Sequence, residues 1–213
     1  GQHTVHDNAC SASAAAVAAG HSAIQSGDCD LAIVAGANLI IDAGSQSALC
    51  AMGALSPTCV CAPFSSSADG YVRGEGCGVL LLKSERQALA DGDTIHSVIN
   101  ACAQNSDGTA SSLTSPSVNA QQRVIEKAQL KAGVTSHQMA YFECHGTGTK
   151  VGDPIEILAL VKTFGGVTPK HPPIIGAVKA DIGHLESACG VVAVIKTALV
   201  LQNHMSPGLR HPA

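Results

Sequence analysis

Two uninterrupted apolar segments constrain the fold of this chain more than any other feature. They span residues 30–37 (DLAIVAGA) and 76–83 (GCGVLLLK). A strand with one face in water alternates apolar and polar residues, whereas a continuous apolar run is typical of a strand covered on both faces. Neither segment reaches the roughly 18 apolar residues that a membrane span requires. The sequence therefore predicts two buried strands and no membrane span.

Further strands and helices are predicted in alternation along the chain. Strands are expected at residues 3–9, 94–103, 139–144 and 173–178, and helices at residues 10–27, 84–90, 118–132, from 153 onward and at 188–202. The first helix is apolar on nearly every face, which is typical of a buried helix. Asp153 and Pro154 suit the N-cap and first position of a helix, and Gly133 suits a helix end. This alternation predicts the α/β class.

The composition argues against several classes of function. The chain has 12 Lys and Arg against 16 Asp and Glu, a formal net charge of −4, so it lacks the basic footprint of a nucleic-acid-binding protein. Its nine cysteines are odd in number and scattered through apolar segments. This pattern favours small buried side chains in a reducing compartment over a disulfide framework. Cys59 and Cys61 lack the spacing and the second ligand pair of a zinc site, so no metal is expected.

Cys10 is the candidate nucleophile. It lies in residues 7–13 (DNACSAS), where the expected strand gives way to the expected helix. A helix N-terminus carries partial positive charge and N–H groups, which favour a thiolate over a thiol. The small neighbours of Cys10 leave room for a substrate, and its own N–H is suited to face an oxyanion. A purely structural packing role is the alternative.

Two histidines in glycine-flanked turns extend the candidate site. His145 lies in residues 143–149 (ECHGTGT), and His184 lies in residues 179–186 (KADIGHLE). Each follows an expected strand and precedes an expected helix, so both should lie at carboxyl ends of strands, where α/β proteins bind ligands. The alternative is that they are turn histidines bonded to the backbone.

Polar residues around these turns complete the set. Thr147 and Thr149 offer hydroxyls to a polar ligand. Lys179 has two candidate ion-pair partners, Glu156 and Asp181, and a solvated surface position is the alternative.

Together these motifs resemble those of β-ketoacyl synthases, closest to the ketosynthase domains of type I polyketide synthases and animal-type fatty acid synthases. The matching segments are residues 7–13 (DNACSAS), 53–57 (GALSP), 68–76 (ADGYVRGEG), 145–154 (HGTGTKVGDP) and 179–184 (KADIGH). The resemblance runs nearly end to end. It implies the thiolase-like fold, a layered α/β/α/β/α sandwich made of two similar halves. Residues 1 to about 100 would form the last part of the N-terminal half, and residues from about 101 to 213 would belong to the C-terminal half.

The resemblance also implies a reaction. Cys10 would accept an acyl group, and His145 and His184 would serve malonyl decarboxylation and stabilise the enolate and the thioester oxyanion. The resulting carbanion would attack the Cys10 thioester in a Claisen condensation. These roles agree with the chemistry, because thioester exchange needs an activated thiol and an enolate needs hydrogen-bond donors.

Supporting residues and partners follow from the same resemblance. Lys179 and Glu156 match an ion pair that supports the histidines, and Thr147 and Thr149 match hydroxyls that bind the phosphopantetheine arm. The substrate would be carried on the 4′-phosphopantetheine of an acyl carrier protein, with no bound cofactor. We expect an acyltransferase and other synthase domains in the same full-length chain, and a homodimer whose contact includes residues 30–37. A cytoplasmic location is expected, with a plastid as the alternative.

The sequence departs from the family pattern in several places. Asn8 replaces Thr, Ala12 replaces Ser, Ser65 replaces Asp and Asp181 replaces Asn. The charge of Asp181 is expected to raise the pKa of His184. The N-terminal strands and the C-terminal glycine-phenylalanine loop, which supplies a second oxyanion N–H, are missing. We therefore expect a partial ketosynthase domain.

Two other functions stay open. One is a thiolase or chalcone-synthase-like condensing enzyme, although these use a second cysteine or an asparagine where this chain has His184. The other is an inactive scaffold that only docks carrier protein, although such proteins usually lose the cysteine and Cys10 is present. The motifs do not separate polyketide from fatty acid products, or iterative from modular use.

Overall fold

The computed structural model describes residues 1–108, 115–165 and 170–209, and the chain divides into two compact units. The first unit combines residues 1–41, 73–102 and 184–207. The second combines residues 42–72 and 103–183 with the C-terminal end from residue 208. Among the described residues, every helix is too short or too polar to span a bilayer.

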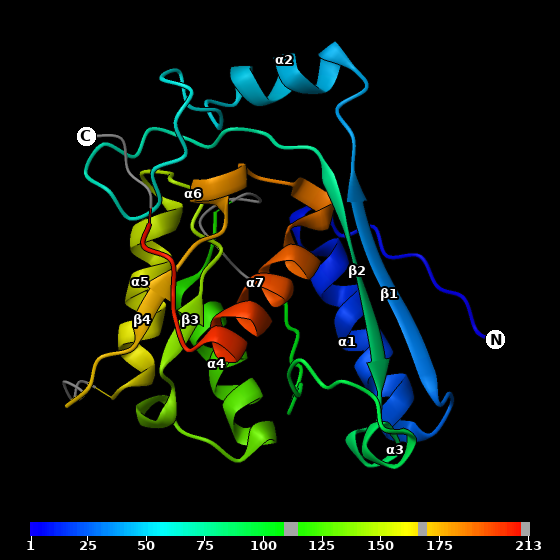
Figure 1. Cartoon of the computed structure of the whole chain (residues 1–213). Coiled ribbons are helices and arrows are strands. Elements are labelled where there is room, and N and C mark those ends of the chain that lie inside the picture. The colour runs from blue at the N-terminus through cyan, green and yellow to red at the C-terminus, as the bar shows by residue number, and fades with distance from the viewer. Residues whose placement is uncertain (109–114, 166–169, 210–213) are drawn as a thin grey trace. The chain divides into compact units, whose positions relative to one another are not determined.

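A two-stranded antiparallel sheet organises the first unit. Strand β1 (Leu31–Asn38) pairs with β2 (Gly76–Lys83), with Leu31 opposite Lys83 and Asn38 opposite Gly76. The helices α1 (Ala12–Ser26) and α7 (Cys189–Asn203) pack against these strands (Figure 1). A Cβ at Gly36 would lie 2.7 Å from the Cβ of Ser13 on α1. The strand therefore needs glycine there to let the helix approach.

The second face of this sheet is open. Leu31, Ile33, Val79 and Leu81 are exposed by 46%, 72%, 59% and 66%. These side chains alternate along β1 and β2 with half-buried or buried ones such as Val34, which is 4% exposed. The two predicted strands are confirmed, but the prediction that both faces are covered is wrong for these residues, because the packed helices cover one face.

The segment before α1 differs from the prediction. Residues 3–8 form no strand, and a 3₁₀ turn, η1 (Ala9–Ser11), leads directly into α1. The predicted helix is confirmed, but it is not buried all round, since only Ala12, Ser13 and Val17 on it are buried. The apolar character of α1 comes mainly from alanine, whose small side chain buries little surface wherever it lies.

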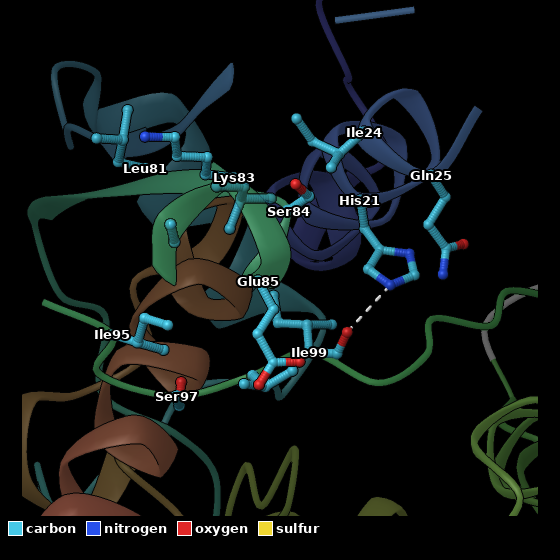
Figure 2. A pocket seen from close by; sticks show the side chains of 13 residues that line it. His21, Ile24, Gln25, Leu81, Lys83, Ser84, Glu85, Ile95, Ser97 and Ile99 are labelled. Atoms are coloured by element: carbon cyan, nitrogen blue, oxygen red, sulfur yellow. Dashed lines mark hydrogen bonds between the residues drawn. The ribbon is translucent and has the colours of Figure 1, made fainter. Parts of the chain in front are cut away.

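The other end of the first unit holds a short helix and an extended segment. Ser84 caps α3 (Glu85–Asp91) by accepting a hydrogen bond from Gln87 N, as expected for a helix at 84–90. The strand predicted at 94–103 is not formed, because this segment has no ladder partner among the described residues. Instead, Nε2 of His21 lies 3.1 Å from the carbonyl oxygen of Ile99, beside a cavity of about 420 Å³ (Figure 2).

The second unit is built on a short parallel sheet. Strand β3 (Tyr141–Glu143) pairs with β4 (Ile174–Gly176), which confirms two predicted strands. Helices α4 (Val118–Ala132) and α5 (Gly152–Thr163) pack on each other in this unit (Figure 1). The remaining helices are α2 (Ala43–Ala51), the 3₁₀ turn η2 (Ser136–Gln138) and α6 (Lys179–Ile182). Helix α4 has the predicted bounds and ends at Gly133, which has a φ of +69°.

Asp153 does not cap the helix that it was expected to start. Helix α5 begins at Gly152, two residues before the predicted first position at Pro154, and Val151 is its N-cap. The Asp153 carboxylate instead accepts hydrogen bonds from Phe64 N at 2.7 Å and Gly148 N at 3.1 Å. It is 4% exposed, and it joins the loop before α5 to a loop 89 residues away in sequence.

Candidate active site

Cys10 lies on a strained turn at the start of α1. The preceding residue, Ala9, has a φ of +50°, a left-handed conformation that non-glycine residues rarely adopt. Ser11 closes the turn, with its N and Oγ both donating to the carbonyl oxygen of Asn8, at 3.1 and 2.8 Å. Such strain concentrates at functional sites. The position of Cys10 before a helix of 15 residues agrees with the sequence analysis.

The start of α7 holds this turn in place. The Cys189 thiol donates to the carbonyl oxygen of Cys10 at 3.0 Å, and Val191 N donates to Ser13 Oγ at 3.1 Å. Between them, Gly190 lies so close to α1 that a Cβ would be 2.4 Å from Ala14 N. The residues just before α7 are therefore fixed relative to Cys10. Sequence reasoning missed Cys189 in this role.

His184 is buried in the same unit, five residues before α7. It is 1% exposed, and its Nδ1 accepts a hydrogen bond from Glu186 N at 3.0 Å. Its carbonyl oxygen accepts from Gly74 N at 2.9 Å. Because Nδ1 is an acceptor, the neutral imidazole carries its proton on Nε2. His184 is therefore held as a donor at Nε2.

An ion pair that sequence reasoning missed lies beside His184. Arg73 donates to Glu186 through Nε at 2.5 Å and through Nη2 at 3.0 Å. Both side chains are largely buried, with 7% and 21% of their surface exposed. The only signal in the sequence was that Arg73 lies inside a matched motif and Glu186 lies two residues after another.

His145 follows β3 in the second unit and is held by its main chain. Its backbone N donates to Glu156 Oε1 at 2.6 Å, and Gly146 N donates to Oε2 at 2.8 Å. Gly146 has a φ of +45°, and a Cβ there would lie 2.6 Å from the Cβ of Ala177. The side chain of His145 is exposed. The carboxylate of Glu156 thus fixes the turn from which the imidazole projects.

Glu156 and Lys179 lie in the same electrostatic environment. Burial raises the pKa of Glu156, while the N–H groups of Gly146 and His145 and the charge of Lys179 oppose that rise. Lys179 is 2% exposed on α6. The charge of Lys179 lowers the pKa of Glu156, so the two side chains interact electrostatically.

Four of the predicted site residues line one cavity in the second unit. Its volume is about 490 Å³, and its wall includes His145, Thr147, Thr149 and Glu156. The two threonine hydroxyls lie 3.1 Å apart, and Thr149 Oγ1 accepts from Gly152 N at 3.1 Å. An imidazole, two hydroxyls and a carboxylate in one cavity suit a polar ligand.

The remaining cysteines divide by burial. Cys61, Cys144 and Cys189 are buried as expected, whereas Cys50, Cys59 and Cys77 are exposed, contrary to expectation. Burial raises the pKa of the Cys61 and Cys144 thiols. Negative charge on Glu156 and Glu143 adds to this effect at Cys144. These two thiols are unsuited to nucleophilic chemistry.

The seven predicted site residues thus fall into two groups. Cys10 and His184 belong to the first unit, while His145, Thr147, Thr149, Glu156 and Lys179 belong to the second. In the second unit, His145, Thr147, Thr149 and Glu156 line one cavity. The joint Cys-His-His site stays a prediction.

Comparison with known proteins assigns the chain to a family. Residues 1–88 match the model of the β-ketoacyl synthase N-terminal domain, and residues 96–212 match that of the C-terminal domain. A highly reducing polyketide synthase of Aspergillus nomiae is 45% identical over 202 residues, covering 94% of this chain and 8% of that protein. A non-reducing polyketide synthase of Gibberella zeae is 44% identical over 210 residues, covering 97% and 10%.

Solved structures agree with these matches. The oxazolomycin ketosynthase domain of Streptomyces albus superimposes with a TM-score of 0.91 and 38% identity, covering 95% of this chain and 35% of that one. The fold is therefore the thiolase-like α/β fold of ketosynthases, as predicted. The chain spans about a tenth or less of the curated relatives and about a third of the solved domain. Its motifs, its fold and both halves of the family model agree, and the chain belongs to the β-ketoacyl synthase family.

Proposed function

We propose that the complete protein is a condensing acyltransferase that joins an acyl group on Cys10 to a malonyl-type extender. The observation that carries this proposal is the pairing of two features in one unit. Cys10 lies on a strained turn at a helix start, and the segment packed against that turn holds His184 as a donor at Nε2. A nucleophile and an oriented donor are the two groups that a condensation needs.

The first step is acyl transfer to Cys10. The Cys10 thiol loses its proton, and the thiolate attacks the carbonyl carbon of an acyl thioester. A C–S bond forms to Cys10, the C–S bond to the carrier breaks, and the carrier thiolate takes up that proton. The partial positive charge at the start of α1 supports the thiolate form. The backbone N–H groups at this helix start suit the negative charge that develops on the thioester oxygen.

The second step is decarboxylative condensation. The extender loses CO2, and the electrons of the broken C–C bond form an enolate on the remaining thioester. Donors at His184 and His145 stabilise the enolate oxygen. The enolate carbon then attacks the carbonyl of acyl-Cys10, a C–C bond forms, and the Cys10 thiolate leaves. The products are CO2, a β-ketoacyl thioester on the carrier and the Cys10 thiolate, which takes the negative charge of the malonyl carboxylate.

The cavity in the second unit supports a role in holding the carrier arm. A phosphopantetheine arm is long and rich in amide groups, and the hydroxyls of Thr147 and Thr149 can bond to such groups. The names of the relatives, which are polyketide synthases, favour an acyl carrier protein as the partner. We extend the proposal to an acyltransferase and other domains in the same full-length chain, a homodimer and a cytoplasmic location.

Acyl loading tests the proposal. The complete protein is incubated with an acyl-pantetheine thioester, and acylated peptides are mapped by mass spectrometry. We expect acylation on the Cys10 peptide, its loss in Cys10→Ala and its retention in Cys77→Ala, which removes an exposed thiol of the same unit. CO2 release from a malonyl carrier is then measured, with His184→Ala and His145→Ala expected to lower its rate.

The result also separates this enzyme from a scaffold. A folded complete protein that binds carrier protein but accepts no acyl group would overturn the condensing function and leave a docking role. Acylation that persists in Cys10→Ala would place the nucleophile elsewhere.

A further inference from the structure

The ion pair between Arg73 and Glu186 is unusual for its surroundings. It is bidentate, with N–O distances of 2.5 and 3.0 Å, and only 7% of the Arg73 side chain is exposed. By comparison, Lys83 in the first unit pairs with Asp91 and Asp93, whose side chains are 42% and 48% exposed. An ion pair removed from water contributes little net stability by itself, but losing one partner leaves a buried charge unpaired. Such a pair fixes geometry rather than adding free energy.

The pair is connected to His184 at two points. Glu186 N donates to Nδ1 of the His184 ring at 3.0 Å. The segment that carries Arg73 runs beside His184 as an isolated parallel bridge, and Gly74 N donates to the His184 carbonyl oxygen at 2.9 Å. The two side chains and the two main-chain contacts form a closed ring of interactions. The ring holds both the backbone and the imidazole of His184.

Glu186 has a backbone conformation that explains why the ring needs its ion pair. Its φ is +39°, a left-handed value that side chains other than glycine disfavour. In this conformation the Glu186 N–H donates to the imidazole of His184 while the Glu186 carboxylate accepts from Arg73. A strained backbone conformation persists only when the surrounding structure holds it. Here the Arg73 guanidinium binds the Glu186 carboxylate through two hydrogen bonds.

We infer that Arg73 and Glu186 are positioning residues for His184, which hold its ring as a donor at Nε2. The inference rests on the proposed function, in which that Nε2 faces the developing oxyanion. Neither side chain is argued to touch the substrate. Without the pair, Glu186 relaxes from its left-handed conformation, Nδ1 loses its donor and the imidazole is no longer held in one tautomer and orientation.

The test measures the two half-reactions separately in the complete protein. Acylation of Cys10 by an acyl-pantetheine thioester does not require His184 as a donor to the enolate, whereas decarboxylation of a malonyl carrier does. We expect Glu186→Gln and Arg73→Met to lower the kcat of decarboxylation on the order of 10²-fold, as misplaced groups do, with little change in KM. Cys10 acylation should stay within about threefold of wild type.

Matched variants separate positioning from general stability. Arg73→Lys keeps the cation but loses the bidentate geometry, so its decarboxylation kcat should lie between wild type and Arg73→Met. Lys83→Ala breaks the ion pairs with Asp91 and Asp93 in the same unit and should leave both half-reactions unchanged. If Arg73→Met fails to fold, the decarboxylation kcat of wild type, Arg73→Lys and Glu186→Gln can still be ranked.

His184→Ala distinguishes the two proposals. Decarboxylation that survives in His184→Ala would overturn the role of His184 in the proposed function and this inference with it. Decarboxylation lost in His184→Ala but kept at the wild-type kcat in Glu186→Gln and Arg73→Met would overturn the positioning role alone. An equal loss of both half-reactions together with a lower melting temperature would show a merely structural pair.

Discussion

His184 and His145 both follow an expected strand in a glycine-flanked turn, but the two units hold them in different ways. His184 is 1% exposed, and its ring nitrogen Nδ1 accepts a hydrogen bond from Glu186 N. His145 is exposed, and its backbone N donates to the Glu156 carboxylate. One residue is fixed through its ring and the other through its main chain. A bond to Nδ1 fixes tautomer as well as direction, whereas a bond to the main chain fixes only the place of the turn.

This difference assigns different tasks within the proposed reaction. A buried ring with a fixed tautomer is suited to donate one hydrogen bond in one direction, as oxyanion stabilisation requires. An exposed ring on a fixed turn beside a cavity of about 490 Å³ can reorient and exchange protons with a ligand or with water. A variant in one of the two regions can therefore be judged against the unchanged region.

The largest expected difference lies between the thiols of the two regions. Cys144 precedes His145, and burial together with negative charge from Glu156 and Glu143 raises its thiol pKa. Cys10 is partly exposed at a helix start. With iodoacetamide at neutral pH, we expect alkylation of Cys10 to be on the order of 10³-fold faster than that of Cys144, because the thiolate is the reacting form.

Peptide mapping of the alkylated complete protein measures both rates in one experiment. The exposed Cys50 and Cys59 serve as internal references for thiols with open access. Comparable rates at Cys10 and Cys144 would contradict the assignment of the nucleophile to the first region.

His145 is held by its main chain, so a substitution at the neighbouring Gly146 should strongly lower the local stability of this turn. An alanine Cβ would lie 2.6 Å from the Cβ of Ala177, and the φ of +45° adds strain. We expect Gly146→Ala to lower the local free energy of opening by about 3 kcal/mol, from overpacking and the left-handed backbone together. Hydrogen exchange of peptides around residues 141–149 in the complete protein measures this value.

Gly133 provides the matched control for this change. It also has a left-handed φ, of +69°, but a Cβ there would meet nothing within 4 Å. Gly133→Ala should therefore cost only the backbone strain, about 1 kcal/mol. Equal costs at the two glycines would mean that the contact with Ala177 does not matter.

The sequence predicted the positions of helices and strands better than it predicted their burial and their pairing. The apolar runs at 30–37 and 76–83 led to β1 and β2, because strand length and turn residues are local properties. The open face of their sheet was not foreseen, since exposure depends on which elements pack there. The strand expected at 94–103 failed for a related reason, since a strand exists only through its partners.

The candidate site shows the same division. Cys10, His145 and His184 were found from local motifs, because each was expected in a turn between a strand and a helix. The residues that hold them were missed or misjudged. Glu186 holds His184 through a backbone N–H, which every residue except proline has, and Asp153 accepts a hydrogen bond from Phe64 N across 89 residues of sequence. Local patterns carry no signal for such long-range contacts.

Glu156 gives a pH test of the second region. Burial raises its pKa above the ordinary value of 4.5, so in the folded state the neutral form is favoured more than in the unfolded state. That contribution to stability is complete below pH 4.5 and is lost as the pH rises through the raised folded pKa. Glu156→Gln removes this dependence, and it also leaves one of the two N–H groups without its acceptor.

We expect wild type to exceed Glu156→Gln by about 2 kcal/mol in local stability at acid pH. The gap should narrow as the pH rises, and hydrogen exchange across residues 141–149, corrected for intrinsic rates, measures it. A gap that widens with rising pH would mean that the hydrogen bonds to the carboxylate, rather than its burial, dominate. His184, in the other unit, should be insensitive to this variant.

The smallest effect tests how the first region is assembled. Ser13 is 2% exposed, and its Oγ accepts from Val191 N at 3.1 Å, which joins the starts of α1 and α7. Ser13→Ala leaves that buried N–H without its acceptor and should cost about 1 kcal/mol. Ser22→Ala changes an exposed serine of the same helix and is the control. Hydrogen exchange at residues 189–195 should rise in Ser13→Ala alone, because the bond from Val191 N to Ser13 Oγ is lost there and kept in Ser22→Ala. An unchanged exchange rate would mean that Cys189 and Gly190 hold the two helix starts together without this bond.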